Sequence, residues 1–189
     1  MRKSIVKVGY AKPTYSEDTG YTYAAPTFFE SEKAGGREVK AAAKGEVTEV
    51  YADGQVALSS NANDGYDLDV TLLDIVDDIE KDWLDNEVDA DGNGVAEYST
   101  GKMFPVFALI VVYLLVGGGY ETEYYYQCRV QQRPETGGKT SEGKLDAAFF
   151  SCKLRAYPRD KDEPGKKLVR YVKRSDTMPT AVVEPTVAE

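Results

Sequence analysis

One stretch of this 189-residue sequence limits its possible folds more than any other. Residues 103–116, MFPVFALIVVYLLV, are almost entirely apolar and are followed by three glycines. These 14 residues are fewer than the roughly 20 that span a bilayer as a helix, and Pro105 and the many Val, Ile, Phe and Tyr residues favour a strand. We therefore expect a strand over about 104–115 that is buried on both faces. No membrane association is expected.

Alternation of apolar and polar residues indicates further strands. Residues 66–72 alternate apolar side chains with Asp67, Asp69 and Thr71. In residues 120–133 the tyrosines at 120, 124 and 126 share one parity with Cys128 and Val130, and charged residues take the other. Asp53-Gly54 is a strong hairpin signal. The remaining expected strands cover residues 5–11, 27–33, 37–51, 55–60, 145–157 and 168–173.

Only residues 74–85 show the spacing of an amphipathic helix, with Ile75, Ile79 and Trp83 four residues apart. The expected fold class is mainly β: an antiparallel β-sandwich or partly open barrel with one packed helix. We expect one domain over residues 1–175, with a long hairpin over about 37–63. Residues 176–189 contain two prolines and are expected to form an extended C-terminal arm.

The composition excludes several kinds of chemistry. The absence of histidine excludes Ser-His-Asp and Cys-His catalysis and His-ligated zinc. Cys128 and Cys152 are too few for a four-cysteine metal site, and we expect buried, reduced thiols, the alternative being a disulfide between neighbouring strands. A net charge of −9 disfavours binding to the phosphate backbone of nucleic acids. Since no residues assemble an active site, we expect neither an enzyme nor a cofactor.

Residues 89–94, DADGNG, match the first half of an EF-hand calcium loop. Asp89, Asp91 and Asn93 would be the ligands. However, position 12 of that loop is Thr100 instead of a bidentate glutamate, and the next residues predict a strand instead of a helix. We expect a turn rich in Asp, Asn and Gly, with weak calcium binding as the alternative.

The order of these elements resembles the major tail tube protein family of long-tailed bacteriophages with non-contractile tails. The resemblance runs from about residue 4 to 173. It rests on IVKVGYAK, the hairpin around Tyr51-Ala52-Asp53-Gly54, DLDVTLLDIVDDIEKDWL, FALIVVYLL with its glycine break, YYYQCRVQQRP and LDAAFFSCKLRA.

The resemblance implies a structural virion protein that forms hexameric rings. The rings stack into a tail tube, bridged by the long hairpin and the terminal arms, and double-stranded DNA is ejected through the lumen without specific binding. Besides other copies of the chain, the implied partners are a tape-measure protein, a distal tail protein and a tail terminator. The implied location is the virion tail, and the host bacterial cytoplasm during assembly.

Acids that face such a lumen would repel DNA phosphates, over a range of roughly 8 Å at physiological salt. The candidates, from the polar faces of alternating strands, are Asp67, Asp69, Glu121 and Glu123. The alternative, with equal weight, is that these four side chains face outward or lie at contacts between subunits. Two other functions stay open: another phage or secretion-type structural β-module, and a weak calcium-binding adhesion module.

Overall fold

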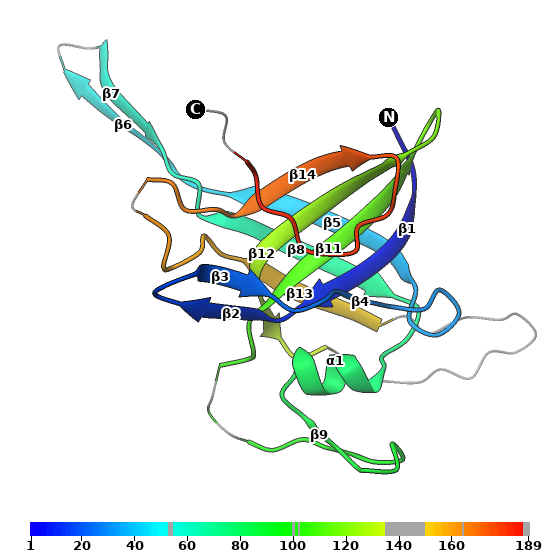
Figure 1. Cartoon of the computed structure of the whole chain (residues 1–189). Coiled ribbons are helices and arrows are strands. Elements are labelled where there is room, and N and C mark those ends of the chain that lie inside the picture. Colours follow the sequence, from blue (N-terminus) through cyan, green and yellow to red (C-terminus); the bar gives the residue numbers. More distant parts are fainter. Residues whose placement is uncertain (53–54, 100, 102, 135–149, 164, 187–189) are drawn as a thin grey trace, which may run out of the picture.

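The computed structural model describes residues 1–52, 55–99, 101, 103–134, 150–163 and 165–186 (Figure 1). It contains one helix, α1 (Asp77–Asp82). The strands are β1 (Arg2–Ala11), β2 (Pro13–Ser16), β3 (Gly20–Tyr23), β4 (Thr27–Phe28), β5 (Gly36–Lys44), β6 (Val47–Ala52), β7 (Gln55–Asn61), β8 (Gly65–Leu72), β9 (Glu87–Val88), β10 (Val95–Ala96), β11 (Phe107–Leu115), β12 (Tyr120–Gln132), β13 (Phe150–Ala156) and β14 (Arg170–Ser175). The expected mainly-β class with one helix is confirmed.

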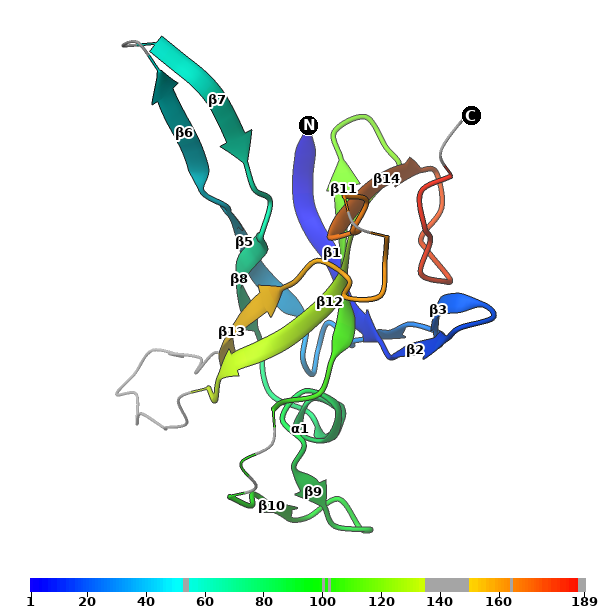
Figure 2. The same ribbon diagram turned by 90° about the vertical axis from the view of Figure 1, so that its left-hand side faces the viewer.

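Eight strands form one antiparallel sheet in the order β4-β1-β11-β12-β13-β8-β5, and β14 pairs with β12 beside this path. The long strand β12 holds β14 along Tyr120–Tyr125 and β13 along Cys128–Gln132, so the sheet branches there. The sheet curls strongly (Figure 2). Its last strand approaches β1 at Gly36, where a Cβ would lie 2.1 Å from Val8 Cγ2. The described strands do not close into a barrel.

Strand β11 is buried on both faces, as the apolar run predicted. Leu109 and Val111 belong to the inner core, on the concave side of the sheet, whereas Ile110 and Val112 belong to an outer core on the other side. Because both apolar faces of β11 have to be shielded from water, other segments pack on each side of it, and the chain folds in layers.

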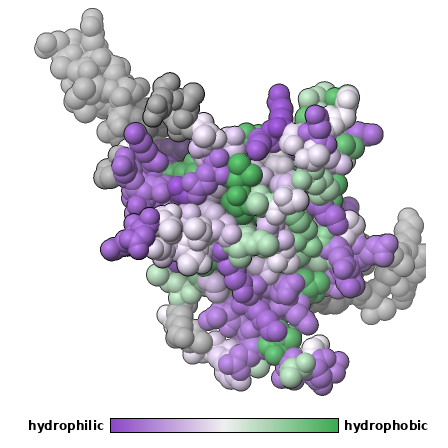
Figure 3. All heavy atoms as spheres, in the orientation of Figure 1, coloured by the Kyte–Doolittle hydropathy of each residue, from purple (hydrophilic) through white to green (hydrophobic). Residues whose placement is uncertain are grey.

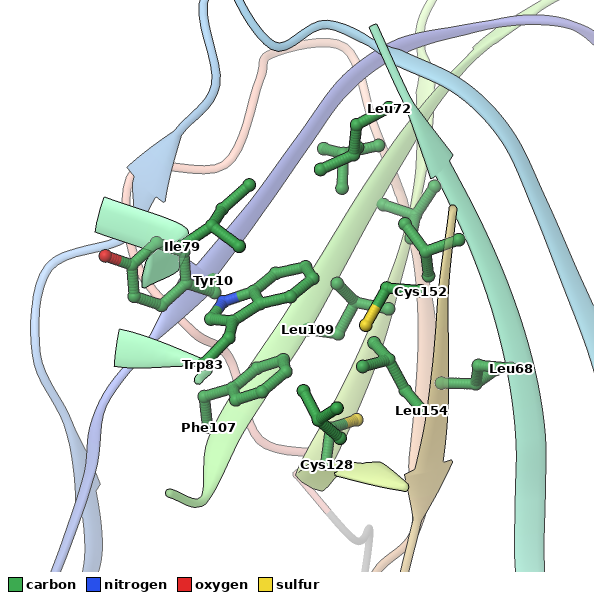
Figure 4. Close-up of a cluster of buried hydrophobic side chains, with 14 of the residues drawn as sticks. Tyr10, Leu68, Leu72, Ile79, Trp83, Phe107, Leu109, Cys128, Cys152 and Leu154 are labelled. Carbon is green, nitrogen blue, oxygen red and sulfur yellow. The ribbon is translucent and has the colours of Figure 1, made fainter. Parts of the chain in front are cut away.

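Helix α1 covers one end of the inner core. Ile79 is fully buried, and the indole of Trp83 stacks on the ring of Phe107 at 4.5 Å between centroids (Figure 4). The helix is shorter than the predicted 74–85, because the backbone is extended at Val76 and left-handed at Asp85. The spacing of the apolar residues therefore identified the buried face but overestimated the length.

The described part of the C-terminal segment, residues 176–186, is extended but folds back over the outer core. Met178, Val182 and Val183 pack there, and Tyr126 donates a hydrogen bond to the carbonyl of Val183. Arg159 adds an ion pair to Glu184 at 2.6 Å. In this chain the segment lies against its own sheet instead of projecting as a free arm.

Candidate functional site

Two of the acids expected on a lumen surface, Glu121 and Glu123, lie inside the protein. In the pairing of β12 with β11, Glu121 stands opposite Tyr113 and Glu123 opposite Val111, and a register shift follows between Tyr125 and Cys128. The bulge reverses the inward-facing parity within β12, so Tyr124 and Tyr126 face the outer core while Cys128 and Val130 face the inner one. Glu121 is 6% exposed and Glu123 is 2% exposed.

Three arginines from the two terminal strands surround these carboxylates. Arg2 Nε of β1 lies 2.6 Å from Glu121 Oε1, and Arg174 Nε of β14 lies 2.8 Å from Glu121 Oε2. Arg2 and Arg170 also form ion pairs with Glu123. We call these five residues the glutamate–arginine cluster.

Tyrosines complete the surroundings of the cluster. The hydroxyl of Tyr125 donates a hydrogen bond to Glu123 Oε2 at 3.1 Å. The Arg2 guanidinium lies over the ring of Tyr113, 4.1 Å from its centroid. Arg170 lies over the ring of Tyr66 at 5.6 Å. The carboxylates therefore accept hydrogen bonds from arginine and tyrosine side chains, and the guanidinium groups of Arg2 and Arg170 lie over aromatic rings.

The electrostatics favour a charged Glu121 and a neutral phenol at Tyr113. Hydrogen bonds from Arg174 and Arg2 lower the pKa of Glu121. Burial, followed by the charge of Glu123, raises the pKa of Tyr113 to about 12. Because burying charges has a large desolvation cost, such a network contributes less to net stability than to fixing where its strands lie. Here it fixes β1 and β14 against β12.

The four predicted lumen acids thus separate into two groups. Glu121 and Glu123 do not fit as bare acids on a lumen wall, because both are buried and paired with arginine; that expectation is corrected. Asp67 and Asp69 lie on the side of β8 that points away from the inner core. Whether this side lines a lumen stays a prediction.

Asp67 and Asp69 belong to a mixed-charge surface. Asp67 pairs with Arg155 Nη1 at 2.8 Å and with Lys44 Nζ at 2.9 Å, and these contacts lower its pKa. Asp69 is exposed and stands in register with Lys40 and with Lys153. We call this surface the outward face; its charged residues are Glu38, Lys40, Lys44, Asp67, Asp69, Lys153 and Arg155. With four bases and three acids it does not present the acidic wall that the sequence suggested.

Strand β5 borders the outward face and has an open edge. It pairs with β8 on one side, and no described strand pairs with its other side. Residues 40–44 are all exposed, and three of them are alanines. An open edge presents backbone donors and acceptors to any further strand, a hazard that proteins normally cover. This edge is the clearest place for a second chain to bind.

A hairpin lies within the predicted range 37–63 but covers only residues 47–61, because residues 36–44 form β5 and pair with β8. Strands β6 and β7 are paired from Val47↔Asn61 to Ala52↔Gln55. They follow on from β5 and β8, and the hairpin projects well beyond the body of the protein (Figures 1 and 2). The expected turn residues, Asp53 and Gly54, lie outside the described residues. The projecting strands are therefore placed where a neighbouring chain could reach them.

The DADGNG segment forms the turn of the short β9–β10 hairpin. The amide of Asp89 donates to the carbonyl of Gly94 at 2.9 Å, and the amide of Asn93 donates to Asp91 Oδ1 at 3.2 Å. Asp91 is thus already used as a turn acceptor. Within the described part of the chain, no three Asp, Glu, Cys or His side chains are grouped so as to hold a metal ion.

The two cysteines are free, and both are buried in the inner core. Cys128 stands opposite Ala156 of β13, four residues from Cys152, so the register does not pair them. Burial raises the pKa of each thiol to about 12. Both therefore behave as small apolar groups, and the alternative of a disulfide is not realised in this structure.

Sequence reasoning missed the three arginines of the glutamate–arginine cluster. A signal was present: in the segment RYVKR, Arg170, Val172 and Arg174 share one side of a strand. Pairing places Glu121 opposite Arg174 and Tyr125 opposite Arg170. Without knowing that β14 pairs with β12, that alternation could not be matched to the glutamates.

Comparisons with protein-family models, with curated proteins and with solved structures each found no match to this chain. Among the described residues, no helix is long and apolar enough to cross a membrane. The features of this chain that bear on its function are therefore the open edge, the hairpin and the distribution of charge.

Proposed function

We propose that this chain is a structural subunit that assembles with copies of itself into hexameric rings. The rings would stack into the tail tube of a long-tailed, non-contractile phage, through which double-stranded DNA is ejected. The observation that carries the proposal is the open edge of β5, continued by the projecting β6–β7 hairpin. The resemblance to tail tube proteins in the order of the elements supports the same reading.

Edge pairing gives a physical route to a ring. A strand of a neighbouring copy added to β5 would satisfy its free backbone groups and continue the sheet from one subunit into the next. When such head-to-tail contacts are related by rotation they close into a ring, and the joined sheets become one large barrel. A hairpin that projects from each subunit can then reach a neighbouring ring.

The interior of the subunit supports a structural role rather than catalysis. Glu121 and Glu123, its buried carboxylates, are engaged by arginines, and its thiols are buried and protonated. These groups rigidify the fold and do not meet in an accessible reaction site. A tape-measure protein, a distal tail protein and a tail terminator would be further partners, with the virion tail as the location.

Negative-stain electron microscopy of the purified chain, over a concentration series with and without EDTA, tests the proposal. Hollow tubes or stacked rings that ignore EDTA are the expected result. Assembly that stops at single rings would favour another structural β-module, such as a connector. Assembly or stabilisation that requires calcium would favour the adhesion alternative. A chain that stays monomeric at every concentration, even with the other tail proteins, would refute a tube subunit.

A pair of proline variants tests the edge itself. In an antiparallel strand, neighbouring residues direct their N–H groups to opposite sides, so either Ala42 or Ala43 points its N–H away from β8. Proline removes that donor. One of Ala42→Pro and Ala43→Pro should therefore keep the wild-type melting temperature and still block assembly, while the other destabilises the fold. Normal assembly by the stable variant would exclude the β5 edge as the contact.

A further inference from the structure

The net charge of this protein is concentrated in one segment. Residues 74–99 contain ten acids and a single base, a net charge of −9 that equals the charge of the whole chain. The rest of the sequence holds 22 acids and 22 bases. We call residues 74–99, which comprise α1, β9 and β10, the acidic lobe. It lies at one end of the protein in both views (Figures 1 and 2).

Most acids of the lobe are not neutralised by their own chain. Lys12 pairs with Asp82 at 2.6 Å, and Arg133 pairs with Glu97 at 2.9 Å. Of the remaining eight, Glu80 is half-buried and accepts a hydrogen bond from Asn86 at 2.6 Å. The other seven are exposed and form no ion pair with described residues; they are Asp74, Asp77, Asp78, Asp85, Glu87, Asp89 and Asp91. Figure 3 shows hydrophilic side chains over this end of the surface.

Exposed apolar side chains accompany these acids. Val95 is 49% exposed, Tyr98 is 55% exposed, and the adjacent Met103 is 76% exposed. Tyr98 and Met103 line an open groove of about 480 Å³ together with Phe104 and Arg133. An apolar patch with a charged rim is the usual anatomy of a protein–protein interface.

The opposite end of the protein has the same anatomy with the opposite charge. The start of β1 and the end of β14, residues 1–3 and 173–174, contain four bases and no acid. These bases, Arg2, Lys3, Lys173 and Arg174, lie next to the turn between β11 and β12. The amide of Val116, in that turn, donates to the carbonyl of Met1 at 2.9 Å. We call residues 1–3, 116–119 and 173–174 the basic tip.

The basic tip also exposes apolar side chains, since Val116 is 62% exposed and Met1 is 94% exposed. Beside the tip, the three arginines of the glutamate–arginine cluster face two glutamates, which leaves one surplus positive charge; the exposed Asp176 next to Gly119 is an acid at this end. In both ribbon views the N-terminus and the β11–β12 turn lie at the end away from α1 and β9 (Figures 1 and 2).

We propose that the acidic lobe of one copy docks on the basic tip of the next copy. This inference rests on the proposed function, and it names the surfaces through which copies would stack. The partner is a second copy of this chain, because both complementary surfaces are carried at opposite ends of one molecule. Such a contact is head to tail and leaves both ends of a stack open to growth. Charge complementarity of this kind fixes partner and register.

Charge reversal at each end, alone and combined, tests the contact. The lobe variant is Glu87→Lys with Asp91→Lys, and the tip variant is Lys3→Glu with Lys173→Glu; all four side chains are exposed. Sedimentation velocity and negative-stain microscopy at low salt give the concentration at which stacks form. Each double variant should raise that concentration by at least about tenfold, because each reversed side chain would then face a like charge across the contact. The chain carrying all four changes should recover stacking.

A matched control is Glu17→Lys with Asp18→Lys, in the turn between β2 and β3, which changes the net charge as much as the lobe variant. It should stack like the wild type. Stacking that is unchanged in both double variants, or not recovered in the fourfold variant, would overturn the docking contact while leaving the tube subunit intact. A wild-type chain that never associates would overturn both proposals together.

Discussion

Replacing Glu123 with glutamine should destabilise the protein through one buried charge. Glu123 is 2% exposed and is engaged by two arginines and by the hydroxyl of Tyr125. Glutamine keeps the shape of the side chain and removes its charge. Three guanidinium groups would then face a single carboxylate, Glu121.

The size of the effect follows from the exposure of the partners. Removing one member of a buried ion pair costs about 3–5 kcal/mol. The side chains of Arg2 and Arg170 are 38% and 30% exposed, so water compensates part of their charge. We therefore expect a loss of roughly 2–4 kcal/mol in the free energy of unfolding. At roughly 2–4 °C per kcal/mol for a chain of this length, the melting temperature should fall by about 5–15 °C.

Urea unfolding followed by circular dichroism measures this loss, with Asp67→Asn as the matched control. Asp67 also pairs with two bases, but its side chain is 35% exposed. Exposed pairs contribute about 0–1 kcal/mol, so the control should be nearly neutral. Equal effects of Glu123→Gln and Asp67→Asn would refute the reasoning, because burial would then not distinguish the two carboxylates.

Two further predictions concern titration. The pKa of Glu121 is lowered in the folded state, chiefly by Arg174, so its contribution is present above the ordinary value of 4.5 and is lost as the pH falls through the folded pKa. The melting temperature should therefore fall as the pH is lowered below about 4.5, and it should fall less steeply in Glu121→Gln. Identical plots of melting temperature against pH for the two proteins would contradict this. Cys128 and Cys152, with thiol pKa values of about 12, should not react with a thiol reagent at pH 8 until urea unfolds the chain; rapid labelling of the folded protein would contradict their burial.

Much of the fold could be predicted from short-range patterns. The apolar run fixed β11 as a strand buried on both faces, and the spacing of Ile79 and Trp83 identified the buried face of α1. These two predictions were correct because each pattern depends only on neighbouring residues and on the repeat of its own strand or helix. The hairpin was found for the same reason, since β6 and β7 are adjacent in the chain.

What failed depends on contacts between distant segments. The bulge in β12 reverses its parity, and it is set by pairing with β11 rather than by the sequence of β12. The burial of Glu121 and Glu123 requires arginines from residues 2, 170 and 174, on strands far away in the chain. Acidic residues at alternate positions of a strand predict a solvent-exposed face unless their basic partners are known.

The glutamate–arginine cluster and the proposed docking surface are physically connected. Arg2 and Arg174 hold β1 and β14 to β12, and these strands carry Lys3 and Lys173 to the basic tip. If the cluster orients the tip, Glu123→Gln should weaken stacking more than its loss of unfolding free energy explains, even at temperatures where the subunit stays folded. Since Glu123 is buried, it cannot contact a neighbouring copy itself. An effect on stacking would therefore act through the placement of the two terminal strands.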